Sequence, residues 1–206
     1  MNHPDFDCAR EYALKRLERE LAPNLFYHSL AHTRDEVAPA VQRLAALEGV
    51  KGVPLLLLLT ATYYHDIGFL KQRHDHELAS IAIAKETLPA FGYHPLQIQT
   101  MAQIILATAA WQAPRTLLEQ ILVDADFDVL GTEAYAHRSL DLRRELEAFG
   151  VWSSDEAWYR GQLDFLQSHR YWTQSARRLR SAGKQCNLEL VKAQLEALQA
   201  RLAGEA

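Results

Sequence analysis

Residues 53–68 read VPLLLLLTATYYHDIG, an apolar run that ends in a histidine, an aspartate and, two residues later, a glycine. From Leu55 to Tyr64 the run is apolar on nearly every side, which is typical of a helix at the centre of a core. An adjacent His65-Asp66 pair on a helix points its side chains about 100° apart. Both side chains can reach one ion only where the helix ends, and Gly68 predicts an end at this point.

The rest of the chain repeats the helical pattern. Apolar residues recur at spacings of three and four, and Pro- and Gly-containing turns, Gly131 and Gly183 among them, separate the repeats. No run of alternating β-branched residues occurs, so we predict an all-α protein, a helical bundle with essentially no sheet. The expected helical segments are 12–21, 37–47, 55–64, 78–88, 98–106, 117–130, 140–149, 158–166 and 188–202.

The length favours one domain. We expect 206 residues to form a single domain with a core at about 24–150 and C-terminal helices at about 154–203 packed on it. The tail Cys186–Ala206 is expected to form the final helix, packed either within the chain or against a second subunit of a homodimer.

Composition excludes several classes of function. Apolar residues make up 49% and charged residues 23% of the chain, and the formal charge is −4, so no nucleic-acid partner is expected. The two cysteines form no Cys-x-x-Cys motif, which excludes a thiolate zinc site. The polar N-terminus lacks a signal-peptide pattern, and the apolar run 53–59 is far shorter than the roughly 20 residues that span a bilayer. We therefore expect a cytoplasmic protein with no membrane partner.

Three further segments carry imidazole or carboxylate groups within this apolar pattern. They are His28-Ser29-Leu30-Ala31-His32, His74-Asp75-His76-Glu77 and Asp124-Ala125-Asp126. If Ser29 caps a helix, His32 lies in its first turn and His28 lies just outside, so both can face one cavity.

A metal site explains these groups together. A buried carboxylate without a partner is costly, so it must be paired or bind a metal. Histidine and aspartate together suit a divalent ion such as Mn, Fe, Ni, Co or Zn. Each segment alone is typical of an ordinary core histidine, a solvated loop or a salt bridge. Their occurrence in one helical chain predicts a metal site.

The set resembles the HD superfamily of metal-dependent phosphohydrolases, whose name comes from the His-Asp dipeptide. The matching residues are His32, His65-Asp66 and the segment Asp124-Ala125-Asp126. The resemblance implies that His32, His65, Asp66 and one aspartate of that segment hold the ion, with Mg as a further option. Asp124 and Asp126 diverge by about 200° on a helix, so one ion hardly takes both. We choose Asp126, which shares a helix face with Leu122 and Leu130, and leave Asp124 a supporting role.

The resemblance also implies catalytic roles. His28 matches the residue that protonates the leaving oxygen in related phosphodiesterases, and Asp66 could bridge a second ion. His76 and Glu77, like Asp124, are candidates for a second ion or for supporting the ligands. Lys71 is the candidate for holding a substrate phosphate, and Arg34 and Arg73 also lie close to the motifs in the sequence.

The implied function is hydrolysis of a phosphate ester, of a nucleotide or a related small metabolite. Whether the ester is a monoester or a diester stays open. Cyclic-nucleotide hydrolysis is not the default expectation, because no purine-recognition signature can be placed. An alternative is a ligand- or metal-sensing module of the same fold without turnover. A di-iron oxygenase, which would also recruit His74, is the third reading.

Overall fold

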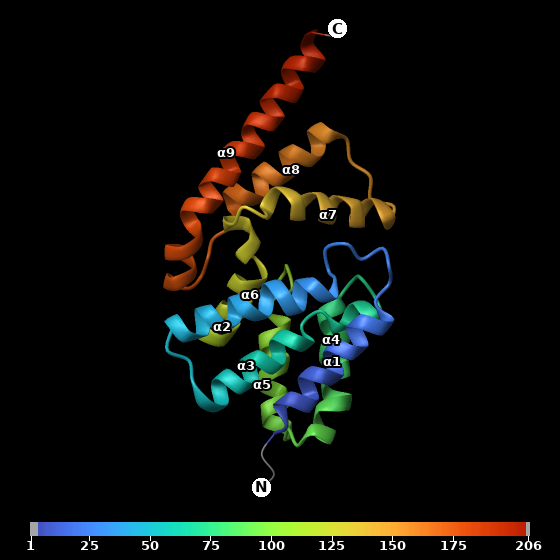
Figure 1. The fold of residues 1–206 in the computed structure, drawn as a ribbon, viewed down its shortest axis with the longest axis vertical. Helices are drawn as coiled ribbons and strands as arrows, with labels where there is room; N and C mark the ends of the chain where they lie inside the picture. The colour runs from blue at the N-terminus through green and yellow to red at the C-terminus, as the bar shows by residue number, and fades with distance from the viewer. Residues whose placement is uncertain (1–3, 205–206) are drawn as a thin grey trace. The chain divides into compact units, whose positions relative to one another are not determined.

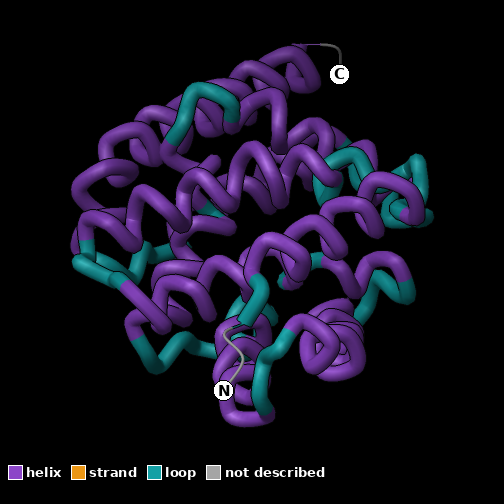
Figure 2. The backbone as a smooth tube through the Cα atoms, turned by 60° about the horizontal axis from the view of Figure 1, so that its bottom comes forward, coloured by secondary structure: helices purple, strands orange, loops and turns teal. Residues whose placement is uncertain are grey.

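The structure, a computed structural model, describes residues 4–204, and all regular structure in that range is helical (Figure 2). The all-α prediction is confirmed. The chain divides into two compact units with the boundary between Phe127 and Asp128. The single-domain organisation, with a core that ends near residue 150, stays a prediction.

The first unit is built around α3 (Gly52–Tyr64), which packs against helices from before and after it in the sequence (Figure 1). Leu58, Ala61 and Tyr64 of this helix are fully buried. The other elements of the unit are α1 (Phe6–Glu20), η1 (His32–Val37), α2 (Ala38–Leu47), η2 (Ile67–Leu70), α4 (His76–Thr87), η3 (Leu88–Phe91), α5 (Pro95–Leu106) and α6 (Leu117–Asp126).

The stretch Gly52–Leu70 is long and apolar enough to cross a membrane by length and composition alone. Its mean hydropathy is 1.3, but 67% of it is buried inside the structure. This burial is typical of a core helix, and α3 fills that place in the first unit.

One helical segment of the first unit departs from α geometry. The chain turns into a helix at Leu30, and η1 is a π-helix that leads directly into α2. The backbone N–H of Ala38 donates to the carbonyl of Thr33, five residues earlier, which is the wide π-type pairing. Such wide turns are often found at functional sites.

The second unit consists of η4 (Asp128–Gly131), α7 (Tyr135–Ala148), α8 (Asp155–Ser168) and α9 (Gln174–Gly204). The last helix starts twelve residues before the expected start at Cys186, and it continues through Gly183, which we had predicted to separate helices. That prediction is wrong. Residues 205–206 of the expected tail lie outside the described residues.

Close packing explains the glycine within α9. A Cβ at Gly183 would lie 2.2 Å from the carbonyl oxygen of Gly131, and a Cβ at Gly131 would lie 2.4 Å from the carbonyl oxygen of Arg180. The two glycines therefore let η4 and α9 touch through their backbones. Side chains of α9 fix the contact, since Asn187 donates to the carbonyl oxygens of Leu130 (3.0 Å) and Thr132 (2.8 Å).

We predict that Gly183→Ala lowers the melting temperature, because the new methyl group meets backbone that cannot rotate away. The expected cost is about 1–3 kcal/mol, the usual range for overpacking. Gly161→Ala is the matched control, because Gly161 is also helical but has nothing within 4 Å of an added Cβ. This control should be neutral or slightly stabilising, since alanine is the better helix former. Equal melting temperatures for the two variants would contradict the packing role.

Candidate metal centre

The ends of four helical elements bring the predicted ligands together in the first unit. His32 is the first residue of η1. Its backbone N–H donates a hydrogen bond to the hydroxyl of Ser29 at 3.4 Å, as expected if Ser29 caps the helix. His65 and Asp66 follow α3, where η2 begins. Asp126 is the last residue of α6. Side chains at helix ends can converge on one point, whereas neighbours within a helix diverge.

The cluster is compact and mostly buried. His32, His65 and Asp66 each offer one ligand atom, and these atoms lie within 4.8 Å of one another. Asp66 Oδ2 lies 3.3 Å from His65 Nε2 and 3.7 Å from His32 Nε2. Asp126 Oδ1 lies 3.1 Å from His32 Nε2 and 3.7 Å from His65 Nε2. His76 Nε2 reaches the other oxygen of Asp66 at 3.4 Å.

The three histidines of this cluster share one orientation. Each is held through Nδ1 by an oxygen atom of the protein and turns Nε2 towards a carboxylate. An Nδ1–H that donates to oxygen leaves a lone pair on Nε2, which is how protein partners orient histidine ligands of metals. The Nδ1 partners are Glu36 Oε2 for His32 (3.1 Å), the Thr62 carbonyl for His65 (2.7 Å) and the Arg73 carbonyl for His76 (3.2 Å).

Two atoms at the centre lack a hydrogen bond. His65 Nε2 and Asp66 Oδ2 are buried, and among the described residues neither has a hydrogen-bond partner. Leaving such groups bare is costly, so their persistence needs an explanation. A divalent cation that accepts a lone pair from each atom would satisfy both. The residues present therefore fit the metal ion that the resemblance implies.

The electrostatics of the cluster also favour a cation. Burial lowers the pKa of His32, but its hydrogen bond to Asp126 and the other nearby carboxylates raise it overall to about 10. Burial is likewise outweighed at His65 and His76, whose pKa values are raised by neighbouring carboxylates. Burial would raise the pKa of Asp66, yet His65 and His76 hold it well below its usual range. His32 and His65 likewise hold the pKa of Asp126 below its usual range. Asp66 and Asp126 thus keep their negative charge, which is stabilised by positive charge beside them, either as protons on the histidines or as a metal ion.

Phe69 organises the outer part of the cluster. Its ring stacks on His76, with centroids 4.0 Å apart, and on His28, with centroids 4.4 Å apart. His28 is half-buried, and its ring lies 6.0 Å from that of His32. The sequence does not single out Phe69, since an apolar residue in an apolar stretch gives no signal of its own.

The turn after His65-Asp66 is fixed by Ser80 and Gly68. The Ser80 hydroxyl donates to the carbonyl of His65 at 2.6 Å and accepts from the backbone N–H of Gly68 at 2.8 Å. A Cβ at Gly68 would lie 1.9 Å from the carbonyl oxygen of His76, so the glycine lets α4 approach the turn. This contact brings His76 to Asp66. The predicted helix end is correct, but the supporting role of Ser80 was not foreseen.

Other candidate residues lie outside the central cluster. Asp124 is fully buried in α6, and Glu77 Oε1 lies 3.6 Å from His76 Nε2. His74 is exposed. Lys71 is also exposed, and its positive charge acts on Glu20 at the end of α1. The role of Lys71 in holding phosphate stays a prediction.

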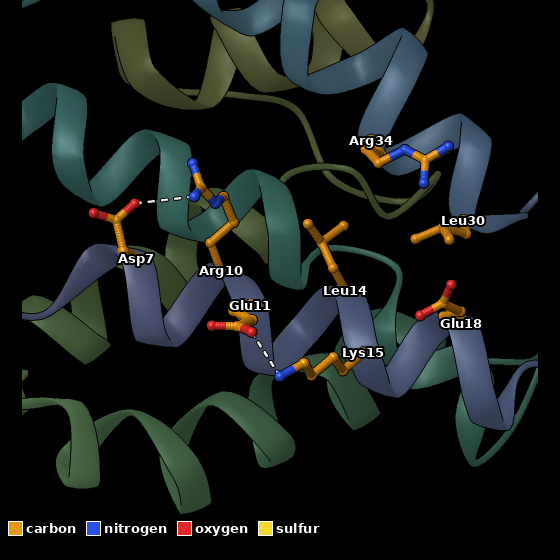
Figure 3. Close-up of a pocket in the computed structure, with 8 residues that line it drawn as sticks. All are labelled: Asp7, Arg10, Glu11, Leu14, Lys15, Glu18, Leu30 and Arg34. Carbon is orange, nitrogen blue, oxygen red and sulfur yellow. Dashed lines mark ion pairs between the residues drawn. The ribbon is translucent and has the colours of Figure 1, made fainter.

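Arg34 takes part in a surface ion pair, and its role in holding phosphate stays a prediction. Its guanidinium pairs with the neighbouring Asp35 at 2.8 Å. It lies with Leu30 across a surface groove from α1, whose charged residues line the other side (Figure 3).

Comparison with known proteins identifies the fold. The structure is similar to the crystal structure of a predicted HD superfamily hydrolase from an uncultured Thermotogales bacterium. The TM-score is 0.59 and the sequence identity is 18%, over 98% of this chain and 94% of the other. No protein-family model and no curated protein matches the chain. The chain thus has the fold of an HD superfamily protein, and the expected HD-type bundle is confirmed.

The geometry separates the two aspartates of α6. We predict that Asp126→Asn removes most of the bound metal, because the substitution takes away a charged oxygen that contacts both His32 and His65. Asp124→Asn is the control of equal size on the same helix and should retain the metal. Elemental analysis of the purified variants, with circular dichroism to verify folding, makes the measurement. Metal loss from Asp124→Asn alone would mean that the other face of α6 carries the ligand.

Proposed function

We propose that the first unit is the catalytic centre of a metal-dependent phosphohydrolase that cleaves a phosphate ester of a nucleotide or a related small metabolite. The observation that carries the proposal is the set of three histidines whose Nε2 atoms converge on the carboxylates of the buried Asp66 and the half-buried Asp126. The HD fold, which is shared with a protein described as a predicted hydrolase, supports the same conclusion.

The ligands in this proposal are His32, His65, Asp66 and Asp126. Two carboxylates balance the charge of one divalent ion when the imidazoles are neutral, so the buried centre becomes electrically neutral on binding. When held by these residues, a divalent ion would supply a positive charge that lowers the pKa of water and polarises a phosphoryl oxygen. Asp66 also contacts His76 through its second oxygen, which allows a second ion beside the first.

Glu36 and Phe69 are proposed as positioning residues. Glu36 fixes the ring of His32 through Nδ1, and Phe69 holds the rings of His28 and His76 by stacking. Ligands and substrate-facing groups held in this way need little rearrangement during the reaction, which is the main benefit of a preorganised site.

His28 is proposed as the general acid. Its ring is close to that of His32 but points at it edge-on, with an interplanar angle of 81°, and Phe69 covers one of its faces. The half-buried ring can meet a substrate that enters the centre from outside. An imidazolium N–H of His28 would donate a proton to the leaving oxygen.

We predict that His28→Gln lowers turnover by about 10²–10⁴-fold, the usual contribution of a general acid. The loss should be smaller for nitrophenyl phosphate esters, whose leaving groups need little protonation, than for alkyl esters. Bound metal should be unchanged. The measurement is hydrolysis of a panel of phosphate esters with Mn, Co, Ni or Mg added.

His74→Gln is the control, because His74 is an exposed histidine in the loop before α4. It should retain the activity of the unaltered protein. An equal loss for good and poor leaving groups in His28→Gln would make His28 a substrate-positioning residue. Absence of turnover in the unaltered protein on the whole panel would favour a sensing module.

A further inference from the structure

A cavity lies wholly within the second unit, where the loop after α8 leads into the first turns of α9. Its volume is about 620 Å³, which is in the range of small-molecule pockets. Basic and aromatic side chains dominate its wall. Those that matter here are His169, Arg170, Tyr171, Trp172, Arg177 and Lys184.

The charge around this cavity is segregated. The second unit as a whole has eleven basic and eleven acidic side chains, counting Lys and Arg against Asp and Glu. Residues 165–188, however, contain five Lys or Arg and no Asp or Glu. An evenly charged unit thus concentrates positive charge along one segment, and three of these cations line the cavity.

The three cations are held by neutral groups. Lys184 Nζ donates to the carbonyl of His169 at 2.6 Å, Arg177 Nε to the carbonyl of Tyr171 at 3.0 Å, and Arg170 Nη1 to the carbonyl of Gln167 at 3.3 Å. Within the described residues, none of the three has a carboxylate at ion-pair distance. Main-chain carbonyls fix the positions of these side chains but leave their charge uncompensated.

Arg180 in the same helix shows the difference. Its guanidinium pairs with Asp128 through two bonds, Nε at 2.7 Å and Nη2 at 2.8 Å. This arginine completes the packing of η4 on α9, and it does not line the cavity. Arg170, Arg177 and Lys184, which line the cavity, therefore differ from Arg180, whose charge is balanced by Asp128.

The titration of two groups agrees with an uncompensated positive field. Burial lowers the pKa of Lys184, and the charge of Arg170 lowers it further. Burial also lowers the pKa of His169, and the charges of Lys184 and Arg170 add to the effect, to about 4. Like charges depress both groups, as expected where an anion is missing.

Two aromatic side chains complete the cavity. Lys184 Nζ lies 5.8 Å from the centre of the buried Tyr171 ring, which helps to hold the ammonium group in place. Trp172 remains 40% exposed although it is large and apolar. An exposed indole beside a cluster of cations suits a ligand that has both a flat ring and a phosphate.

We infer that this cavity binds a nucleoside monophosphate or a closely related nucleotide, with the phosphate beside Arg170, Arg177 and Lys184 and the base against Trp172. The site belongs to the second unit alone, so it does not depend on the proposed hydrolysis in the first. A nucleotide bound here would act as an additional ligand of the protein, separate from the substrate of the metal centre.

The test titrates the full-length protein with AMP and follows tryptophan fluorescence. We expect saturable quenching that comes mainly from Trp172. Trp172→Phe keeps a ring for stacking and should lose most of the quenching, while calorimetry still detects AMP binding. Inorganic phosphate should compete with AMP, and adenosine should bind more weakly than AMP because it lacks the charged group.

Two variants test the basic wall. Arg170→Gln and Lys184→Gln should each weaken AMP binding about tenfold or more, since a charge-assisted hydrogen bond is lost. Arg178→Gln is the matched control, because Arg178 is exposed on α9 but does not line the cavity, and its affinity should equal that of the unaltered protein. Within residues 4–204, Arg170 makes a single long hydrogen bond, to the carbonyl of Gln167, so its substitution should leave the fold intact.

Several outcomes would overturn the inference. Full quenching in Trp172→Phe would place the nucleotide elsewhere. Equal affinity in Arg170→Gln and Arg178→Gln would remove the role of the basic wall. Absence of saturable quenching would mean that nucleotides do not bind here. Tighter binding of single-stranded RNA than of AMP, weakened by the same two variants, would identify a nucleic-acid surface instead.

Discussion

Two negative charges at the centre of the first unit constrain the structure around them. Asp66 and Asp126 stand among histidines in a largely apolar bundle, where an uncompensated carboxylate is unfavourable. Positive charge must therefore be supplied at this point. The ends of α3 and α6, the start of η1 and the start of α4 all meet here. Each brings a group that carries negative charge or that can balance it.

The supporting contacts follow from the same constraint. A histidine balances or shares charge only when its ring is fixed, and each of the three rings is fixed through Nδ1. Two of those fixing groups are main-chain carbonyls, those of Thr62 and Arg73. Thr62 lies in the last turn of α3, where carbonyl groups have no helical partner, and Arg73 lies in the loop between η2 and α4. The end of α3 thus orients the ring of His65 as well as placing it in the cluster.

The sequence was sufficient for the fold class and for singling out residues that the structure brings together, and the reason is physical. Polar groups in an apolar pattern are conspicuous, so His65-Asp66 and Asp126 could be recognised from one chain. Phe69, Glu36 and the hydrogen bonds of Ser80 could not, because apolar residues and small or surface-type polar residues are ordinary where they occur. Their importance comes from what lies across from them in space, which periodicity does not report. The same limit made Gly183 resemble a helix break, although its function is to let η4 approach.

The π-helix at His32–Val37 lies within one continuous helical stretch and changes the direction in which side chains before and after it point. A wide turn accommodates one more residue than an α-turn, so the segment before it is rotated relative to the segment after it by about 100°. Val41 and Leu44 of α2 point into the core, while His32 on the other side of the wide turn points at Asp126. With uniform α geometry at about 100° per residue, His32 would lie about 180° around the helix from Val41 and about 120° from Leu44, and it would face away from the core. The wide turn removes about 100° of this rotation and brings His32 round to the side of the helix that is buried. The extra residue lets a single helical stretch serve the core and the site at once, and a one-residue deletion in this turn would separate the two without altering any ligand.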